Sequence, residues 1–261
     1  MADSSRDAAL AAHLSGWLRD QVAQARADGL VVGLSGGVDS AVVLRLAQMA
    51  SPGAVVGVVM PCHSSARDEA DARLVARHFE APVVRVELDS PCNALLEALE
   101  SARGQLPDVM AAASSADERQ RLALANVKPR LRMTALYHLA NGLGFLVAGT
   151  GNRSELAIGY YTKYGDGGVD LLPIGGLLKR EVRSLARHLG VPAAIVEKPP
   201  SAGLWPGQTD EHEMGFGYDE LERYLVEGPA SVEPAVAGRI QRLIDLSEHK
   251  RASAPVAPIP E

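Results

Sequence analysis

A short turn rich in serine and glycine carries the residue types that most directly suggest chemistry. Ser35–Ser40, with the sequence Ser-Gly-Gly-Val-Asp-Ser, follows the apolar run Leu30–Leu34, and a helical pattern starts directly after it. Glycines let backbone N–H groups converge on an anion, and the start of a helix adds partial positive charge. Because Asp39 alone would repel phosphate, its presence points to a bridging Mg²⁺ ion. The turn therefore predicts a nucleotide-phosphate site, which is not a Walker A loop because no Gly-Lys-Ser/Thr follows.

A tight connection between a strand and a helix, with a serine cap, is the alternative explanation of this turn. Two adjacent glycines fit that explanation as well as they fit a phosphate site. The complete hexapeptide behind a predicted first strand favours the phosphate site, because open α/β sheets bind ligands at the carboxyl ends of their strands.

A second polar turn, Gly149–Glu155, follows another predicted strand, Gly144–Ala148. It contains the hydroxyl group of Thr150 and the carboxylate of Glu155. If the two strands are parallel neighbours, their carboxyl ends meet at one edge of the sheet. Glu155 and Asp39 could then hold one Mg²⁺ ion between them. Asn152 or Ser154 could instead cap a short helix that has Glu155 in its first turn. Both interpretations can hold together.

Short apolar strands alternate with helical patterns around these turns. The strands are expected at Leu30–Leu34, Ala54–Met60, Val83–Leu88 and Gly144–Ala148, and the helices between them at Ala41–Met49, Asp68–Phe79, from Ala94 onward and over Glu118–Asn141. Continuous apolar strands separated by helices are typical of a parallel sheet with helices on both faces. We therefore expect an α/β fold.

The pattern changes beyond this predicted sheet. Leu178–Leu189 is a predicted helix, which Lys179 opens and Gly190 ends. Residues 198–217 are rich in proline and glycine, which predicts a lid loop. We expect a single domain over 1–251, with a core at about 28–190, the lid at about 198–217, two amphipathic helices at about 217–250, and a disordered tail over 252–261.

Ser35–Ser40 resembles the signature of the N-type ATP pyrophosphatases, which cleave ATP between its α- and β-phosphates and transfer AMP to an oxygen of the substrate. Three further segments resemble the ammonia-dependent NAD synthetases within that superfamily: Asn126–Met133, Gly159–Asp170 and Lys198–Glu211. The resemblance runs from roughly Gly33 to Lys250. It implies a parallel five-stranded sheet of the adenine-nucleotide α-hydrolase type with added C-terminal helices, and a homodimer with the deamido-NAD site at the subunit interface.

The resemblance also implies a role for individual side chains. Asp166 and Lys179 would be catalytic, and Asp39 with Glu155 would hold Mg²⁺. ATP, the co-substrate, would contact Gly33, Leu34, Ser35, Gly36, Gly37, Val38, Asp39, Ser40, Thr150, Lys179 and Ser201. Deamido-NAD would contact Arg130, Lys163, Asp170, His249 and Lys250.

The reaction implied by the resemblance is deamido-NAD + ATP + NH₃ → NAD + AMP + pyrophosphate. A carboxylate resists attack by an amine because its leaving group would be oxide, and adenylation of the carboxylate removes that obstacle. Turn N–H groups, Lys179 and Mg²⁺ would stabilise the negative charge on the leaving pyrophosphate. We expect Asp166 to bind ammonium and to accept its proton.

Composition narrows the class of protein. The chain has 261 residues, 47% hydrophobic and 22% charged, as ordinary globular proteins do. Its net charge of −6 disfavours binding to nucleic acid. Apolar runs stay short of the about 18 residues of a membrane span, and no signal peptide is evident. Two cysteines cannot form a disulfide framework, so we expect a reducing, cytoplasmic environment.

Other functions remain open on the sequence alone. Another N-type pyrophosphatase that acts on a different carboxylate would share Ser35–Ser40 but lack the run Lys163–Asp170. A nucleotide sensor without catalysis would have lost the acidic and lysine positions, which are present. Cys62 and His63 form a weak nucleophile pair, because adjacent side chains at a strand exit point apart. The length leaves no room for a glutaminase domain, so free ammonia is the expected nitrogen source.

Overall fold

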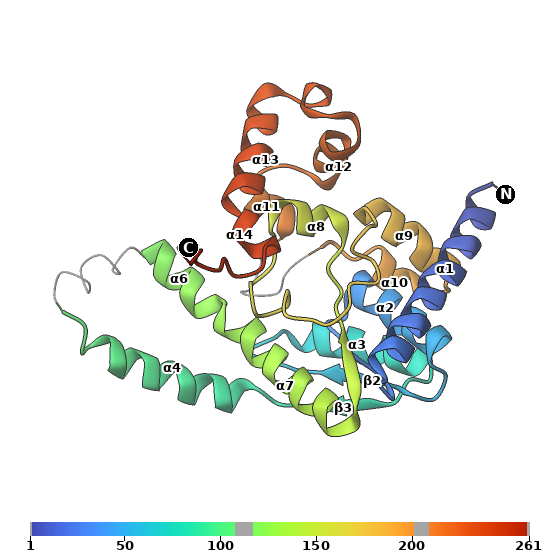
Figure 1. Cartoon of the computed structure of the whole chain (residues 1–261), viewed down its shortest axis with the longest axis horizontal. Coiled ribbons are helices and arrows are strands. Elements are labelled where there is room, and N and C mark those ends of the chain that lie inside the picture. Colours follow the sequence, from blue (N-terminus) through green and yellow to red (C-terminus); the bar gives the residue numbers. More distant parts are fainter. Residues whose placement is uncertain (1, 108–116, 201–208, 260–261) are drawn as a thin grey trace.

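A parallel sheet of four strands lies at the centre of the protein, as the computed structural model shows (Figure 1). The structure describes residues 2–107, 117–200 and 209–259. The strands are β1 (Gly29–Gly33), β2 (Val55–Val59), β3 (Val83–Arg85) and β4 (Phe145–Ala148), in the spatial order β3-β2-β1-β4. The pairs are in parallel register, with Val31 opposite both Val56 and Val147. The predicted α/β class is therefore confirmed.

Helices cover both faces of this sheet and extend beyond its carboxyl edge (Figure 1). They are α1 (Ala2–Ala25), α2 (Val38–Ala50), α3 (Ala66–His78), α4 (Asp89–Arg103), α6 (Asp117–Ala125), α7 (Val127–Leu143), α8 (Arg153–Ile158), α9 (Lys179–His188), α10 (Ala193–Val196), α11 (Asp210–Met214), α12 (Tyr218–Glu227), the 3₁₀ turn η1 (Pro229–Ser231), α13 (Pro234–Leu246) and α14 (Glu248–Arg251). None of them is long and apolar enough to cross a membrane.

Alternating side chains of β1 pack into two separate hydrophobic cores. Leu30 and Val32 pack with α1, α2, α3 and α9 on one face, and Val31 packs with α7 on the other. Successive side chains of a strand point to opposite faces, so a strand buried on both faces must be apolar throughout. The carboxyl end of β1 is thereby held between two packed layers.

A third apolar cluster joins the C-terminal helices to α8. Ile158 of α8 packs with Tyr218 and Leu221 of α12 and with Ile240 of α13. In Figure 1 these helices stand above the sheet, next to α8 and α11. This packing fixes α12 against the short helix that follows β4.

Within the described part of the chain the sheet has four strands and the expected fifth is not formed, so that prediction is wrong. Leu171 makes only an isolated parallel bridge to Ala148 at the outer edge of β4. The N–H of Val147 donates to a side chain, the Asp170 carboxylate, over 2.8 Å. A neighbouring strand would offer backbone carbonyls to that edge. Pro173 and a turn closed by Gly175 N–H on the Leu172 carbonyl then lead the chain away.

Several boundaries differ from the sequence-based expectation. The helix predicted over Glu118–Asn141 is interrupted at Asn126, because Pro129 has no N–H to donate to the carbonyl of Ala125. The third strand ends at Arg85 instead of Leu88. Helix α1 was not predicted, and within the expected lid Asp210–Met214 is helical. The middle of that lid, 201–208, lies outside the described residues.

Two glycines allow a matched test of this packing. A Cβ atom on Gly29 would lie 2.2 Å from the Ala54 carbonyl oxygen and 2.7 Å from the Phe145 ring, whereas Gly16 in α1 has open space. We expect Gly29→Ala to lower the free energy of unfolding by about 1–3 kcal/mol. Gly16→Ala should raise it by about 0.5–1 kcal/mol, because alanine favours a helix interior. Urea unfolding followed by circular dichroism measures both, and a Gly29→Ala variant as stable as wild type would contradict the packing.

Candidate functional site

The two polar turns meet at the carboxyl edge of the sheet, because β1 and β4 are neighbours. Asn152 connects them: its Nδ2 donates to Asp39 Oδ1 over 3.0 Å, and its Oδ1 accepts the N–H of Glu155 over 3.1 Å. The helix-cap interpretation of the second turn is therefore confirmed for Asn152. Glu155 lies in the first turn of α8 and still faces Asp39 across the edge.

The first turn has the form of an anion site. Gly37, and not a serine, precedes α2, and no described side chain caps that helix. Gly36 has φ +77°, and a Cβ atom there would lie 2.5 Å from the Asp68 carbonyl oxygen, so only glycine fits. The hydroxyl groups of Ser35 and Ser40 lie 3.2 Å apart, with the Gly37 N–H on Ser35 Oγ. Free N–H groups at the start of a helix of 13 residues suit a phosphate.

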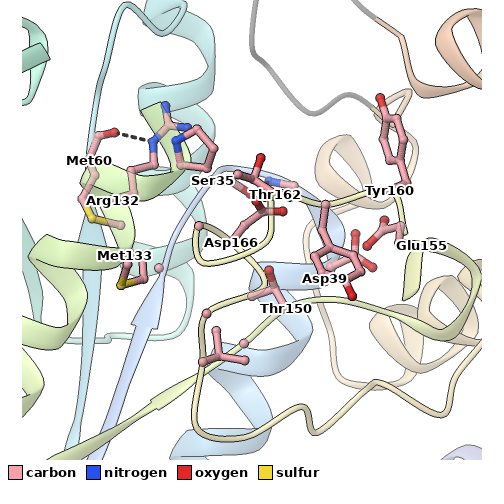
Figure 2. A pocket seen from close by; sticks show the side chains of 18 of the residues that line it. Ser35, Asp39, Met60, Arg132, Met133, Thr150, Glu155, Tyr160, Thr162 and Asp166 are labelled. Carbon is pink, nitrogen blue, oxygen red and sulfur yellow. Dashed lines mark hydrogen bonds between the residues drawn. The ribbon is translucent and has the colours of Figure 1, made fainter. Parts of the chain in front are cut away.

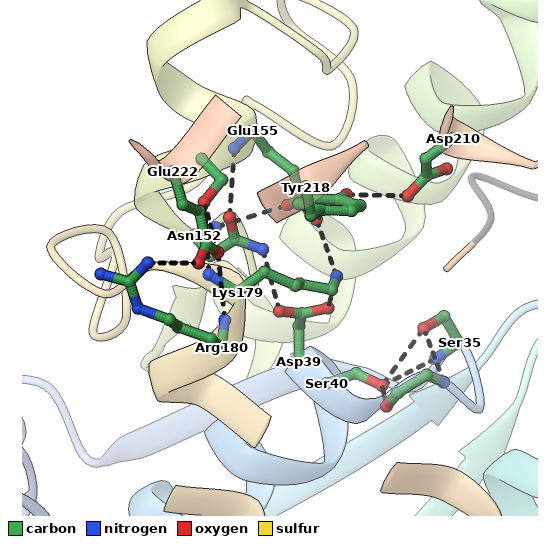
Figure 3. Close-up of polar contacts among 12 residues, drawn as sticks. Ser35, Asp39, Ser40, Asn152, Glu155, Lys179, Arg180, Asp210, Tyr218 and Glu222 are labelled. Carbon is green, nitrogen blue, oxygen red and sulfur yellow. Dashed lines mark hydrogen bonds and ion pairs between the residues drawn. The ribbon is translucent and has the colours of Figure 1, made fainter. Parts of the chain in front are cut away.

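Lys179 lies between the two predicted metal ligands, as Figure 3 shows. Its Nζ is 2.5 Å from Asp39 Oδ2 and 3.0 Å from Glu155 Oε1. The lysine residue is only 4% exposed. Burial lowers the pKa of Lys179, but the two carboxylates raise it more, so the ammonium form is favoured. Burial raises the pKa of Glu155 to about 7, against the attraction of Lys179.

Asp210 brings a third carboxylate close to Asp39 and Glu155, through Tyr218. Tyr218 Oη lies 2.9 Å from Asp210 Oδ2 and 3.4 Å from Glu155 Oε1. Burial raises the pKa of Tyr218, and the negative charges of Glu155 and Asp210 add to that effect. Asp39 and Glu155 contact Lys179 directly, and Asp210 is linked to them through the Tyr218 hydroxyl group.

Mg²⁺ fits this donor set. It prefers oxygen ligands and is commonly held by one or two carboxylates together with phosphate oxygens of the substrate. Asp39 and Glu155 supply the carboxylates, next to the turn that suits the phosphates. The described residues contain no group of three or more histidine, cysteine, aspartate or glutamate side chains arranged to hold a metal ion alone. An ion at this site would therefore depend on the nucleotide for further ligands.

A cavity of about 650 Å³ connects the carboxylate group to the predicted substrate residues (Figure 2). Met60, Met133 and Leu136 give it an apolar end. Of the predicted residues it is lined by Gly33, Leu34, Ser35, Gly37, Val38, Asp39, Arg130, Thr150, Glu155, Lys163, Asp166, Lys179, His249 and Lys250. Gly36, Ser40 and Asp170 do not line it, and Ser201 lies outside the described residues.

Asp166 lies in the turn between α8 and the Leu171 bridge and faces the cavity (Figure 2). Its Oδ1 accepts the Thr162 N–H over 2.9 Å. Burial raises the pKa of Asp166, although this hydrogen bond opposes the rise. A carboxylate with a raised pKa is a stronger base, so Asp166 is suited to hold or accept a proton.

The predicted dinucleotide residues lie around the same turn. Lys163 Nζ contacts the His249 carbonyl oxygen, and Arg130 Nη2 lies 3.4 Å from the Lys163 carbonyl oxygen. Lys250 Nζ donates to the carbonyl oxygens of Gly159 and Tyr161 over 2.6 and 2.7 Å. These contacts gather four cationic or histidine residues from α7, the turn and α14 at one side of the cavity.

Asp170 is held apart from this group by two structural contacts. Its Oδ1 accepts the Tyr137 hydroxyl over 2.9 Å, and its Oδ2 accepts the Val147 N–H. Burial and this carboxylate raise the pKa of Tyr137 to about 12. Asp170 therefore has a packing role at β4, whatever ligand contact it makes besides.

Sequence reasoning missed Arg132, Tyr218 and Asp210. Arg132 lines the cavity, with Nε on the Met60 carbonyl oxygen at 3.1 Å and Nη2 on Ser64 Oγ at 3.0 Å. Burial lowers its pKa. Its position two residues after Arg130 was the available signal. Tyr218 falls in a segment that the sequence predicts as an amphipathic helix, and nothing in the sequence shows that its hydroxyl group reaches the carboxylates.

A model of the NAD synthase family matches residues 10–254. The chain belongs to the NAD synthase family. Among its relatives, the NH₃-dependent NAD⁺ synthetase of Carboxydothermus hydrogenoformans is 51% identical over 91% of this chain and 92% of that protein. The NH₃-dependent NAD⁺ synthetase of Syntrophomonas wolfei is 45% identical over 95% of each. A solved structure titled NMN synthetase from Francisella tularensis is 32% identical, with a TM-score of 0.86 over 97% of this chain and 99% of that one.

Cys62 is not arranged as a nucleophile in this member of the NAD synthase family. Its thiol is buried against the Leu88 carbonyl, while the His63 ring contacts Asn93 Oδ1 on the exposed side. Burial raises the pKa of Cys62 to about 12, so the reactive thiolate is scarce at neutral pH.

We expect both cysteines to resist iodoacetamide at pH 8 in the native protein and to react after unfolding in urea. Mass spectrometry measures the modification, and rapid native labelling of Cys62 would contradict its burial.

Proposed function

We propose that this protein is an ammonia-dependent NAD synthetase, which amidates deamido-NAD at the expense of ATP and releases AMP and pyrophosphate. The observation that carries the proposal is the cavity that joins the phosphate turn, Lys179 and Asp166 in a member of the NAD synthase family. The identity of 51% to an NH₃-dependent NAD⁺ synthetase supports the choice of substrate and nitrogen source.

In this proposal ATP lies with its phosphates on the turn Ser35–Ser40 and near Thr150. Asp39 and Glu155 would hold Mg²⁺, which would neutralise charge on the phosphates when bound. Lys179, already charged and buried beside the turn, pairs with phosphate oxygens as negative charge builds on the leaving pyrophosphate. The apolar end of the cavity suits the adenine base.

The acyl transfer then follows in two steps. An oxygen of the nicotinate carboxylate attacks the α-phosphorus, and the bond to pyrophosphate breaks. Ammonia next attacks the carbonyl carbon of the acyl-adenylate, and AMP leaves with the carboxylate oxygen. Asp166 holds ammonium and accepts its proton, which frees the lone pair for attack. Arg130, Lys163, His249 and Lys250, which line the cavity, bind deamido-NAD. Asp170 lies outside the cavity and acts at β4 instead.

The proposed assembly is a homodimer with the substrate site at its interface. Helices α4 and α6 extend away from the rest of the fold as an arm (Figure 1). Their leucines are partly exposed, with Leu99 at 48% and Leu122 at 50%. Single exposed leucines are ordinary, but four of them, Leu95, Leu99, Leu122 and Leu124, lie on the two helices of this arm, and this concentration supports a second subunit there. We further propose a cytoplasmic location, which the two free buried cysteines support.

A second candidate is an enzyme of the same chemistry that forms NMN. The solved structure titled NMN synthetase, with its TM-score of 0.86, supports that alternative. The carboxylate substrate would then be nicotinate mononucleotide, which lacks the adenylate half of deamido-NAD. Both substrates therefore belong in the same assay.

The test is a pyrophosphate-release assay with Mg-ATP and either carboxylate substrate, with and without ammonium, in which mass spectrometry follows the amide product. We expect NAD from deamido-NAD only when ammonium is present. Asp39→Ala should abolish pyrophosphate release while its far-UV circular dichroism stays native, because it removes a carboxylate from the phosphate site. NMN formation in preference to NAD would favour the second candidate, and Mg²⁺-dependent turnover by Asp39→Ala would refute the metal assignment.

The role of Asp166 has its own test. Asp166→Asn keeps an oxygen for the Thr162 N–H but loses the base. At ammonium concentrations far below saturation we expect NAD formation to fall about 100-fold, since general-base groups contribute on that scale. The exposed Asp219→Asn of α12, with the same chemical change, should be unaffected. Full turnover of Asp166→Asn at low ammonium would show that another group accepts the proton.

A further inference from the structure

A buried carboxylate outside the cavity contacts the two helices that carry Glu155 and Lys179. Glu222 of α12 is 1% exposed. Its Oε1 accepts the Ser154 hydroxyl of α8 over 3.2 Å and the Arg180 N–H of α9 over 3.1 Å (Figure 3). Its Oε2 lies 3.3 Å from the half-exposed guanidinium of Arg180. The Glu222 carboxylate thus accepts hydrogen bonds from the first turns of both α8 and α9.

Side chains accept three successive N–H groups at the start of α9. The N–H of Leu178 donates to Glu181 Oε2 at 3.0 Å, that of Lys179 to Ser154 Oγ at 3.2 Å, and that of Arg180 to Glu222 Oε1. N–H groups at a helix start have no partner within the helix, so these acceptors set where the helix begins. Lys179 is the first residue of α9, and its backbone is therefore located by Ser154 and Glu222.

One face of α12 reaches both ends of Lys179. Tyr218 and Glu222 are four residues apart and so lie on the same side of the helix. The Tyr218 ring lies 5.3 Å from Lys179 Nζ, and its hydroxyl group lies near Glu155. Glu222 acts at the other end, through Ser154, on the Lys179 N–H.

We infer that Glu222 is a positioning residue. Through Ser154 and the start of α9, it fixes where the Lys179 ammonium group lies relative to the ATP phosphates. A lysine side chain is long and flexible, so its reach depends on where its backbone is fixed. The inference rests on the proposed function for the role of Lys179 toward ATP, but it can be measured by binding alone.

The test is calorimetric binding of Mg²⁺ and an α,β-methylene analogue of ATP, in wild type and in a Lys179→Ala background. Glu222→Gln, which keeps the size of the side chain but removes its charge, should weaken binding about tenfold in wild type, as coupled networks of this kind do. In the Lys179→Ala background it should cause no further loss. Glu227→Gln, the same change at an exposed position of α12, should leave binding unchanged.

A role in stability alone predicts a different result. Glu222→Gln would then weaken binding equally in both backgrounds, or leave it unchanged while lowering Tm, and either result would overturn the inference. If Glu222→Gln does not fold, Ser154→Ala replaces it, because that change removes both the acceptor of the Lys179 N–H and the donor to Glu222, and leaves the carboxylate itself in place. Analogue binding without NAD formation would reject the proposed function and not the inference, whereas a wild type that fails to bind the analogue would reject both.

Discussion

The burial of the Lys179 ammonium group between Asp39 and Glu155 is the constraint on which the rest of the site depends. A buried lysine is tolerated only when nearby carboxylates compensate for its lost hydration. The three residues come from α2, α8 and α9, so their meeting fixes three helix starts at one edge of the sheet. The same close approach of opposite charges links the starts of these three helices to one another.

Sequence patterns predicted the short elements, whose structure depends on residues close together in the chain. The apolar runs at β1, β2 and β4 and the turn Ser35–Ser40 could be located because burial on both faces and glycine-dependent backbone geometry act over short stretches. Asp39 and Glu155 could be paired because strand ends in a parallel sheet meet at one edge.

What the sequence could not show depends on contacts between distant segments. A fifth strand was expected beside β4, but the Asp170 carboxylate accepts the Val147 N–H where a strand would offer a backbone carbonyl. No pattern in the local sequence shows that a side chain takes this place. Tyr218 and Glu222 lie on a helix of ordinary amphipathic appearance, and only the third apolar cluster brings them to α8 and α9. Residues that act through the backbone of another segment are invisible to motif analysis for this reason.

The Asp170 contact also affects how separate molecules of this protein meet. An open sheet edge exposes unpaired N–H and carbonyl groups, which can recruit a strand from another chain. At β4 a carboxylate and a single bridge use these groups without offering a continuous ladder. At the opposite edge β3 has only three residues and ends in Arg85, which Glu69 holds as a charged side chain beside the edge. Among the described residues, both borders of the sheet are thus poor templates for pairing with a strand of another chain.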